Sequence, residues 1–114
     1  MTVFAKIIAG EIPCNKIYED EHILAFHDIQ PDAKVHGLVI PKREHLQRIQ
    51  DASVDDAELL GHLMVKIPEI AVLLGVDKTG YRVVTNCGEH SGQEVPHLHF
   101  HILGGEPLGK LRGQ

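Results

Sequence analysis

The stretch His97–Leu98–His99–Phe100–His101 decides the fold that we predict for this chain. Three histidines alternate with bulky apolar residues, and a period of two is typical of a β-strand. Successive side chains of a strand point to opposite faces, so the three imidazoles would emerge on one side, about 6.5–7 Å apart. Leu98, Phe100 and Ile102 would fill the other side and anchor the strand in a core.

Three interpretations compete for this histidine row. The simplest is a polar strand face with hydrogen-bonded histidines, although three histidines in five positions argue against chance. The second is a metal site, because imidazole is a common zinc ligand. Against it, Cys14 and Cys87 are not in CxxC spacing. The third is acid–base or nucleophilic chemistry on phosphorus, which suits an imidazole with a near-neutral pKa. The residues alone favour chemistry slightly over a metal, with the polar face third.

Length, composition and charge limit the classes of protein to which this chain can belong. A length of 114 residues predicts one domain with one hydrophobic core. The hydrophobic fraction of 43% and the charged fraction of 24% are ordinary for a globular protein. The net charge is −5 and lysine and arginine form no block, which argues against a nucleic acid partner. A small nucleotide needs only a local group of donors and stays open.

Cysteine usage and the apolar segments bear on the compartment. Two cysteines are too few for a disulfide framework and suit a reducing compartment. Residues 1–10 contain no apolar segment followed by a small-residue cleavage site, so we predict no signal peptide. No apolar run approaches the ~18–20 residues of a membrane span. We therefore expect a cytoplasmic protein without a membrane partner.

The first third of the chain predicts one short helix and three strands. Thr2 can cap a helix over Val3–Ala9, which Gly10 would end. Residues 16–19 and 22–27 are expected to form a hairpin, and residues 35–40 a third strand. His36 shares its strand face with Leu38 and Ile40, a setting in which most histidines are hydrogen-bonded core residues.

The middle of the chain predicts a long helix. Residues 53–56 resemble a capping signal, with a serine first and acids in the first turn. Apolar residues then recur at intervals of three and four and predict a core stripe. Its members are Leu59, Leu60, Leu63, Met64, Ile67, Ile70, Ala71 and Leu74. Gly75 would end the helix, and Pro68 predicts a kink or two helices placed end to end.

A strand over residues 81–86 and a loop over residues 87–96 precede the histidine row. The loop contains Gly88, Ser91 and Gly92 without periodicity. Such a loop can turn several backbone N–H groups toward one point and form an anion nest, although glycine loops usually only turn.

The histidine run followed by Ile102–Leu103 resembles the His-x-His-x-His motif of the histidine triad superfamily. Further segments resemble the Hint branch of that superfamily in order and spacing. These segments are residues 4–8, 11–13, 25–29, 36–42 and 92–93. Asn86 and Leu103–Gly104–Gly105 favour the Hint branch over the Fhit-like branch, which carries a glutamine where Asn86 stands.

The resemblance implies roles that spacing does not. His99 would be the nucleophile that attacks the α-phosphorus of a nucleoside 5′-phosphoramidate, forming a nucleotidyl-histidine that water hydrolyses. His97 and His101 would hold the phosphate and the tautomer of His99. His36 would support the active site instead of only packing in the core. Asp28 would accept hydrogen bonds from the ribose hydroxyls.

The resemblance also implies a nucleotide pocket without a metal or cofactor. Its residues would be Val3, Phe4, Ile7, Phe26, His27, Asp28, Ile29, Leu38, Asn86, Gly92, Gln93 and Glu94. Glu94 departs from animal Hint proteins, which have a serine there; bacterial-looking members also carry glutamate. A carboxylate beside a phosphate should repel it unless it is paired or turned away.

The fold implied is α+β: a five-stranded antiparallel sheet with one short N-terminal helix and one long helix. Residues 1–114 would form a single domain that pairs into a homodimer. The implied activity is a purine nucleoside phosphoramidase acting on derivatives of AMP or GMP, or on aminoacyl-adenylate-like compounds. The alternatives are a Fhit-like dinucleoside polyphosphate hydrolase, a nucleotide-binding scaffold with incidental activity, and a metal-binding module.

Overall fold

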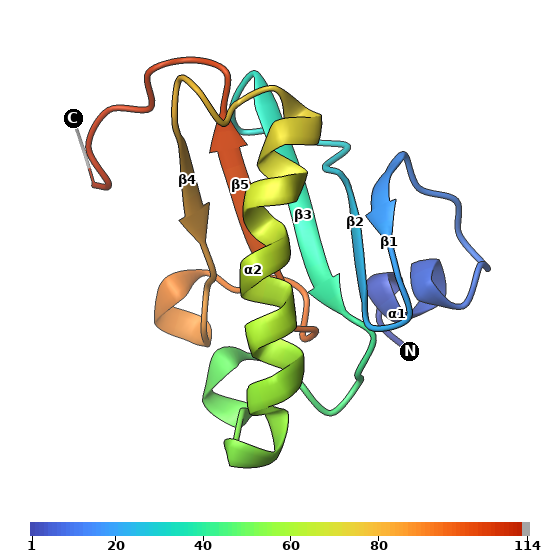
Figure 1. Ribbon diagram of the computed structural model, residues 1–114. Helices are drawn as coiled ribbons and strands as arrows, with labels where there is room; N and C mark the ends of the chain where they lie inside the picture. Colours follow the sequence, from blue (N-terminus) through green and yellow to red (C-terminus); the bar gives the residue numbers. More distant parts are fainter. Residues whose placement is uncertain (113–114) are drawn as a thin grey trace.

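The computed structural model describes residues 1–112 and confirms the predicted α+β class. Five antiparallel strands form one sheet in the order β1-β2-β3-β5-β4, with a helix on each face (Figure 1). The strands are β1 Lys16–Glu19, β2 Ile23–His27, β3 Val35–Pro41, β4 Tyr81–Val84 and β5 Phe100–Gly104. The helices are α1 Val3–Ile8 and α2 Ala57–Leu74, and short 3-10 turns cover Ile49–Asp51, Val54–Asp56 and Glu89–Ser91.

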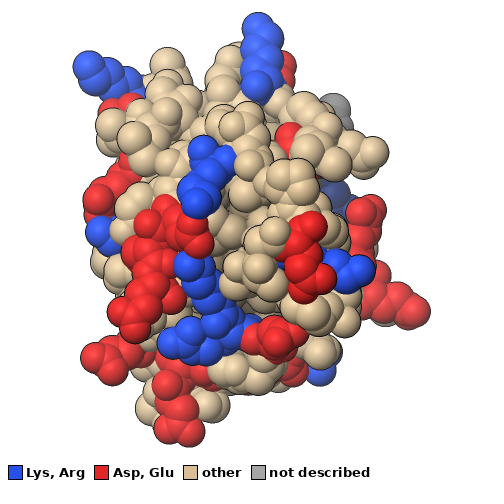
Figure 2. Space-filling model, turned by 90° about the vertical axis from the view of Figure 1, so that its right-hand side faces the viewer, with Lys and Arg blue, Asp and Glu red and all other residues tan. Residues whose placement is uncertain are grey.

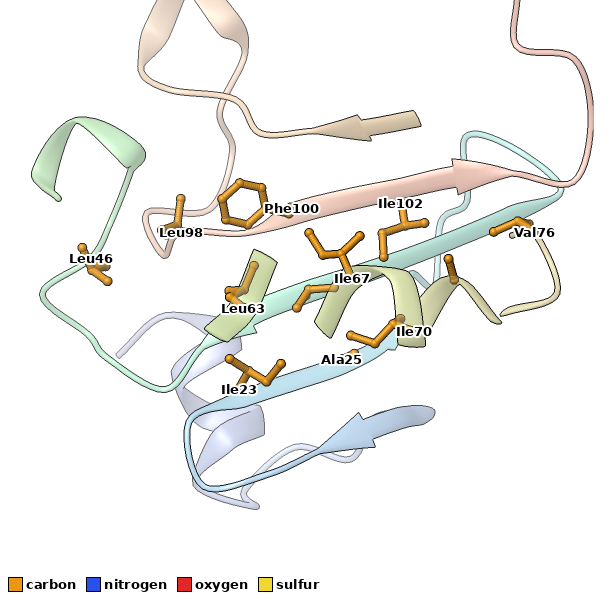
Figure 3. Close-up of a cluster of buried hydrophobic side chains, with 12 residues drawn as sticks. Ile23, Ala25, Leu46, Leu63, Ile67, Ile70, Val76, Leu98, Phe100 and Ile102 are labelled. Atoms are coloured by element: carbon orange, nitrogen blue, oxygen red, sulfur yellow. The ribbon is translucent and has the colours of Figure 1, made fainter. Parts of the chain in front are cut away.

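The face of the sheet under α2 holds the larger core. Alternate residues of the central strands point to this face, because strand side chains alternate. Figure 3 shows Ile23, Ala25, Phe100 and Ile102 of the sheet meeting Leu63, Ile67 and Ile70 of α2. Leu46, Val76 and Leu98 close the ends of this cluster. Burying one such side chain stabilises the fold by about 1.5–3 kcal/mol.

The long helix is continuous, and Pro68 lies within it. Pro68 cannot donate to the carbonyl of Met64, but both residues are exposed, so water can hydrate that carbonyl. Met64 was predicted to lie in the core, and this prediction is wrong, since 42% of it is exposed. The capping signal is also displaced: Ser53 and Asp56 form a capping box around the 3-10 turn that precedes α2.

The opposite face of the sheet packs against α1. Thr2 caps this helix by accepting the Ala5 N–H at 3.1 Å, as predicted. The helix ends at Ile8, one residue earlier than predicted. Phe4 packs edge-on against Phe26, with ring centroids 5.6 Å apart. Leu24, Leu38 and Ile40 complete this smaller cluster.

The strands around the histidine row are shorter than predicted. β5 begins at Phe100, so His97, Leu98 and His99 lie before it. The backbone of these residues bonds to loops instead of a strand ladder. The Leu98 N–H donates to the Leu46 carbonyl at 2.8 Å, and the Thr85 hydroxyl donates to the His99 carbonyl at 2.7 Å.

Side-chain alternation nevertheless holds through this irregular segment. Leu98 belongs to the core under α2, whereas His97 and His99 contact Phe4 on the other face. The strand predicted over residues 81–86 also ends early, at Val84. The predicted single-sided histidine row therefore survives without a continuous strand.

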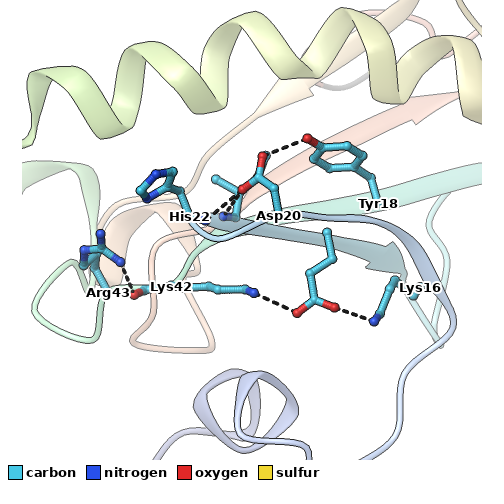
Figure 4. Close-up of polar contacts among 8 residues, drawn as sticks. Lys16, Tyr18, Asp20, His22, Lys42 and Arg43 are labelled. Carbon is cyan, nitrogen blue, oxygen red and sulfur yellow. Dashed lines mark hydrogen bonds and ion pairs between the residues drawn. The ribbon is translucent and has the colours of Figure 1, made fainter.

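Asp20 joins the β1–β2 turn to α2. Its carboxylate accepts the backbone N–H groups of His22 and Ile23 and the Tyr18 hydroxyl (Figure 4). His62 of α2 adds a fourth contact at 2.7 Å. Burial by itself would raise the pKa of Asp20, but these hydrogen bonds outweigh burial and hold that pKa well below its usual range. The turn is thereby locked to the helix.

Charges of both signs are interspersed on the molecular face near β1. Figure 2 shows lysines and arginines there flanked by acidic side chains. Glu19, for example, pairs with both Lys16 and Lys42. This face therefore presents no basic stripe of the kind that tracks a nucleic acid backbone. Among residues 1–112, no helix has the length and apolar character needed to cross a membrane.

Candidate active site

A pocket of about 600 Å³ lies on the face of the sheet that carries α1. This volume is within the range of small-molecule sites. Most of the predicted nucleotide-binding residues line it: Val3, Phe4, Ile7, Phe26, His27, Asp28, Ile29, Leu38, Asn86, Gly92 and Glu94. His99 and His101 line it as well. The fold therefore brings residues from six separate segments to one cavity.

His99 presents a free nitrogen to this pocket. Its Nδ1 lies 2.6 Å from the carbonyl oxygen of His97. A carbonyl can only accept, so Nδ1 carries the proton and Nε2 keeps its lone pair. Nε2 has no hydrogen-bond partner within residues 1–112, and no buried side-chain nitrogen there is left unpaired. Nε2 is therefore accessible, and His99 lines the pocket.

His101 presents the opposite group, an N–H, because a chain of hydrogen bonds sets its tautomer. The Asp32 N–H donates to Nδ1 of His36 at 3.0 Å, so His36 carries its proton on Nε2. That Nε2–H donates to Nδ1 of His101 at 2.8 Å. Burial, with His99 and His36 nearby, lowers the pKa of His101 to about 4. His101 is thus neutral at pH 7 and carries its proton on Nε2.

His36 and His97 bond to the pocket histidines His101 and His99 but do not themselves line the pocket. His97 donates from Nε2 to the Pro41 carbonyl at 2.8 Å, and burial lowers its pKa. The resemblance implied that His97 and His101 hold the phosphate and the tautomer of His99; in this geometry His97 supplies the carbonyl that orients His99 and does not line the pocket. His36 is 4% exposed and orients His101. Both interpretations of His36, core packing and site support, therefore describe it.

One group of residues could hold a metal ion. Asp28, His36 and His101 each offer one ligand atom, and these atoms lie within 4.8 Å of one another. Two histidines and a carboxylate are a ligand set that several transition metals accept. In the structure the two ring nitrogens bond to each other, and the carboxylate of Asp28 lies 3.5 Å from Nε2 of His36. This arrangement satisfies the side chains without an ion.

The loop before the histidines is braced internally. Gln93 was predicted to bind the nucleotide, but it does not line the pocket. Its side chain accepts the Gly88 N–H and donates to the carbonyls of Gln47 and Val95. The N–H groups of Gly88 and Gly92, which could have joined the predicted anion nest, also donate within the loop. Gln93 therefore holds the loop that carries Glu94.

Several lining residues were not predicted. They are Ile12, Pro13, Cys14, Gln30, Asp32 and Val95. Residues 12–14 lie between the first helix and the first strand, and no local pattern links them to the histidines. Gln30 and Asp32 lie in the loop that begins at Asp28. The acidic and proline-containing sequence of this loop was the available signal.

The charged groups that line the pocket share one sign. Asp28, Asp32 and Glu94 are carboxylates, and no lysine or arginine lines the cavity. Glu94 is exposed, and within residues 1–112 it forms no ion pair. Hydrogen bonds to a bound anion must therefore be donated by N–H groups such as that of His101.

The sheet and its histidine row define a class, that of small α+β domains with histidines lining a pocket. Comparison with known proteins places the chain within that class: residues 9–108 match the HIT domain, and the chain belongs to this family. An uncharacterized HIT-like protein of Helicobacter pylori is 53% identical over 106 residues, which cover 93% of this chain and 98% of that protein.

Solved structures agree with this assignment. A HIT family hydrolase from Legionella pneumophila has a TM-score of 0.93 and 42% identity, covering 99% of this chain and 100% of its own. A histidine triad nucleotide-binding protein from Candida albicans has a TM-score of 0.80 and 33% identity, covering 90% of this chain and 73% of its own. The superfamily predicted from the sequence is confirmed.

Proposed function

We propose that this protein hydrolyses the P–N bond of purine nucleoside 5′-phosphoramidates, or the corresponding P–O bond of aminoacyl-adenylate-like compounds, releasing AMP or GMP. The observation that carries the proposal is the accessible Nε2 of His99, whose lone pair is set by the 2.6 Å bond from Nδ1 to the His97 carbonyl. A neutral imidazole oriented in this way suits attack on phosphorus. The similar structures of HIT family hydrolases support a hydrolase.

The reaction would proceed in two displacements at phosphorus. Nε2 of His99 forms a bond to the α-phosphorus, the P–N bond breaks, and its electron pair leaves with the amine, which takes a proton from solvent. Water then attacks phosphorus and gives up a proton to solvent, the electron pair of the bond to His99 returns to Nε2, and the monophosphate leaves. The Nε2–H of His101 donates to a phosphoryl oxygen in both steps, which stabilises developing negative charge. No step requires a metal.

The pocket residues take the remaining roles in this proposal. Asp28 accepts from the ribose hydroxyls, and Asn86, Gly92 and the backbone near Glu94 face the phosphate and the leaving group. The purine is enclosed by the apolar part of the lining, together with His27: Val3, Phe4, Ile7, Phe26, Ile29 and Leu38. Phe4 contacts both Phe26 and His99, so the purine would lie close to the reacting phosphorus.

The direct test is hydrolysis of adenosine 5′-phosphoramidate with a chelator present. We expect the wild type to release AMP and His99→Ala to lose at least about 10³-fold in kcat/KM. His90→Ala removes an exposed histidine outside the pocket and should change nothing. Absence of wild-type turnover, or turnover that survives His99→Ala, overturns the proposal. Faster cleavage of a dinucleoside polyphosphate would favour the Fhit-like alternative, and binding without turnover the scaffold.

We also propose that the protein works as a cytoplasmic homodimer. Support comes from apolar side chains that α2 and β4 leave exposed: Met64, Val65, Val72, Leu73 and Val83. Val65 and Leu73 are 65% and 61% exposed, which is unusual for a row of apolar residues on one helix. A second copy of the chain would cover this surface.

A further inference from the structure

The pocket has two ends, and a carboxylate stands at each. Asp28 lies beside the start of β3, because its N–H donates to the His36 carbonyl at 3.0 Å. Glu94 belongs to the loop that Gln93 ties to the carbonyl of Gln47, beyond the end of β3. His99 lies between them along the strand direction, since its neighbour Phe100 pairs with Val39 in the middle of β3.

This placement gives a bound substrate a direction. The inference rests on the proposed function, in which the ribose bonds to Asp28 and the α-phosphorus lies at Nε2 of His99. In-line attack places the leaving amine on the side of phosphorus opposite Nε2 of His99. Because the nucleoside occupies the end at Asp28, the rest of the amine extends toward the end that Glu94 lines. Glu94 therefore faces the leaving amine and not the nucleotide. This position explains why its carboxylate lines a pocket that binds an anion.

The charge of the lining decides which leaving amine is favoured. Three carboxylates line the cavity without a lysine or arginine. An N-substituted nucleoside phosphoramidate carries one negative charge. The carboxylates of the pocket therefore repel a substrate whose leaving group is neutral. A substrate whose leaving group ends in an ammonium has no net charge and can pair with Glu94. Glu94 forms no ion pair within residues 1–112 and is exposed, so its carboxylate is available.

We infer that Glu94 is a specificity-determining residue that selects phosphoramidates whose leaving amine carries a second, positively charged group. The substrate class is a nucleoside 5′-phosphoramidate of a diamine or of another amine with a free ammonium. The phosphate contacts belong to His99 and His101, and Glu94 contributes only to the choice of leaving group.

The experiment compares two adenosine 5′-phosphoramidates that differ in one group. One is made from 1,5-diaminopentane and ends in an ammonium; the other is made from 5-aminopentanol and ends in a hydroxyl. We expect wild-type kcat/KM to be about tenfold higher for the ammonium substrate at low salt. Glu94→Gln should bring this ratio close to one, and Glu94→Lys should invert it.

Two controls test whether the substrate preference comes from the charge of Glu94 itself or from the overall charge of the protein. Glu89→Gln removes the same charge from the same loop, outside the pocket, and should keep the wild-type ratio. Raising the salt should lower the wild-type ratio, because the Debye length falls from ~30 Å at 0.01 M to ~8 Å at 0.15 M. A wild-type ratio near one, or a ratio that Glu94→Gln leaves unchanged, overturns this inference. If neither substrate is cleaved, the proposed function itself fails.

Discussion

The two faces of the sheet come from the same strands but are built differently. The buried core of the face under α2 is apolar, with Ile23, Val39 and Ile102 among its fully buried residues. The face toward α1 has a smaller apolar cluster and buries three histidines. One face stabilises the fold by excluding water, and the other keeps polar groups in a fixed state next to a cavity.

Backbone groups hold the buried histidines on the pocket side in fixed tautomers. His97, His99 and His36 each bond one ring nitrogen to a backbone carbonyl or N–H. Backbone groups do not titrate, so the tautomers of these rings do not depend on pH-sensitive partners. The comparison predicts that substitutions under α2 alter stability, whereas those on the pocket side alter chemistry.

The largest effect is expected for Ile70→Ala, on the face under α2. Ile70 is fully buried, and its truncation should lower the free energy of unfolding by about 3–4 kcal/mol. Urea denaturation measures this loss, and kcat per folded molecule should be unchanged. Val54→Ala truncates an exposed apolar residue in the turn that precedes the same helix and should cost less than about 0.5 kcal/mol. Equal losses from both variants would contradict the proposed division.

His36→Leu should have the next largest effect, on chemistry. It removes the N–H that sets the tautomer of His101, and we expect kcat to fall about 10–100-fold. His36→Gln keeps an N–H donor and should recover part of the rate. Steady-state kinetics and urea denaturation on both variants test this. A variant that loses stability but keeps kcat would show that His36 only packs.

Asp20→Asn should destabilise the fold by about 2 kcal/mol at pH 7, since four contacts lose a charged acceptor. The pKa of Asp20 is lowered in the folded state, so its contribution is complete above the unfolded pKa of about 3.9 and disappears as the pH falls below it. Denaturation at pH 7 and pH 3 should therefore show a difference that shrinks in acid. Asp77→Asn, at an exposed position, should show none.

Met64→Lys should have the smallest effect on the folded chain, within about 0.5 kcal/mol, because Met64 is exposed. If the exposed apolar side of α2 joins two copies, the added charge should convert a dimer to a monomer in sedimentation velocity. The wild type must first sediment as a dimer. A monomeric wild type, or a dimer that tolerates the lysine, contradicts the proposed assembly.

The prediction from sequence succeeded where the pattern was local. The alternation of His97 and His99 with Leu98, Phe100 and Ile102 assigned the two faces of this segment correctly. It failed at Met64, because a helical stripe shows which residues are apolar but not how wide a surface the sheet can cover. The role of Asp20 has no local signal, since its contact with His62 spans 42 positions.

The sequence by itself determined the elements, their two-sided patterning and the family, because strand and helix periods are properties of neighbouring residues. Only the tertiary structure decided which nitrogen of each histidine carries a proton and that Asp32 joins Asp28 and Glu94 in lining the pocket. These depend on backbone groups such as the Asp32 N–H and the Pro41 carbonyl, whose positions follow from how strands and loops pack. Hydrogen bonding is short-ranged and directional, so it responds to distances in space that no spacing along the chain contains.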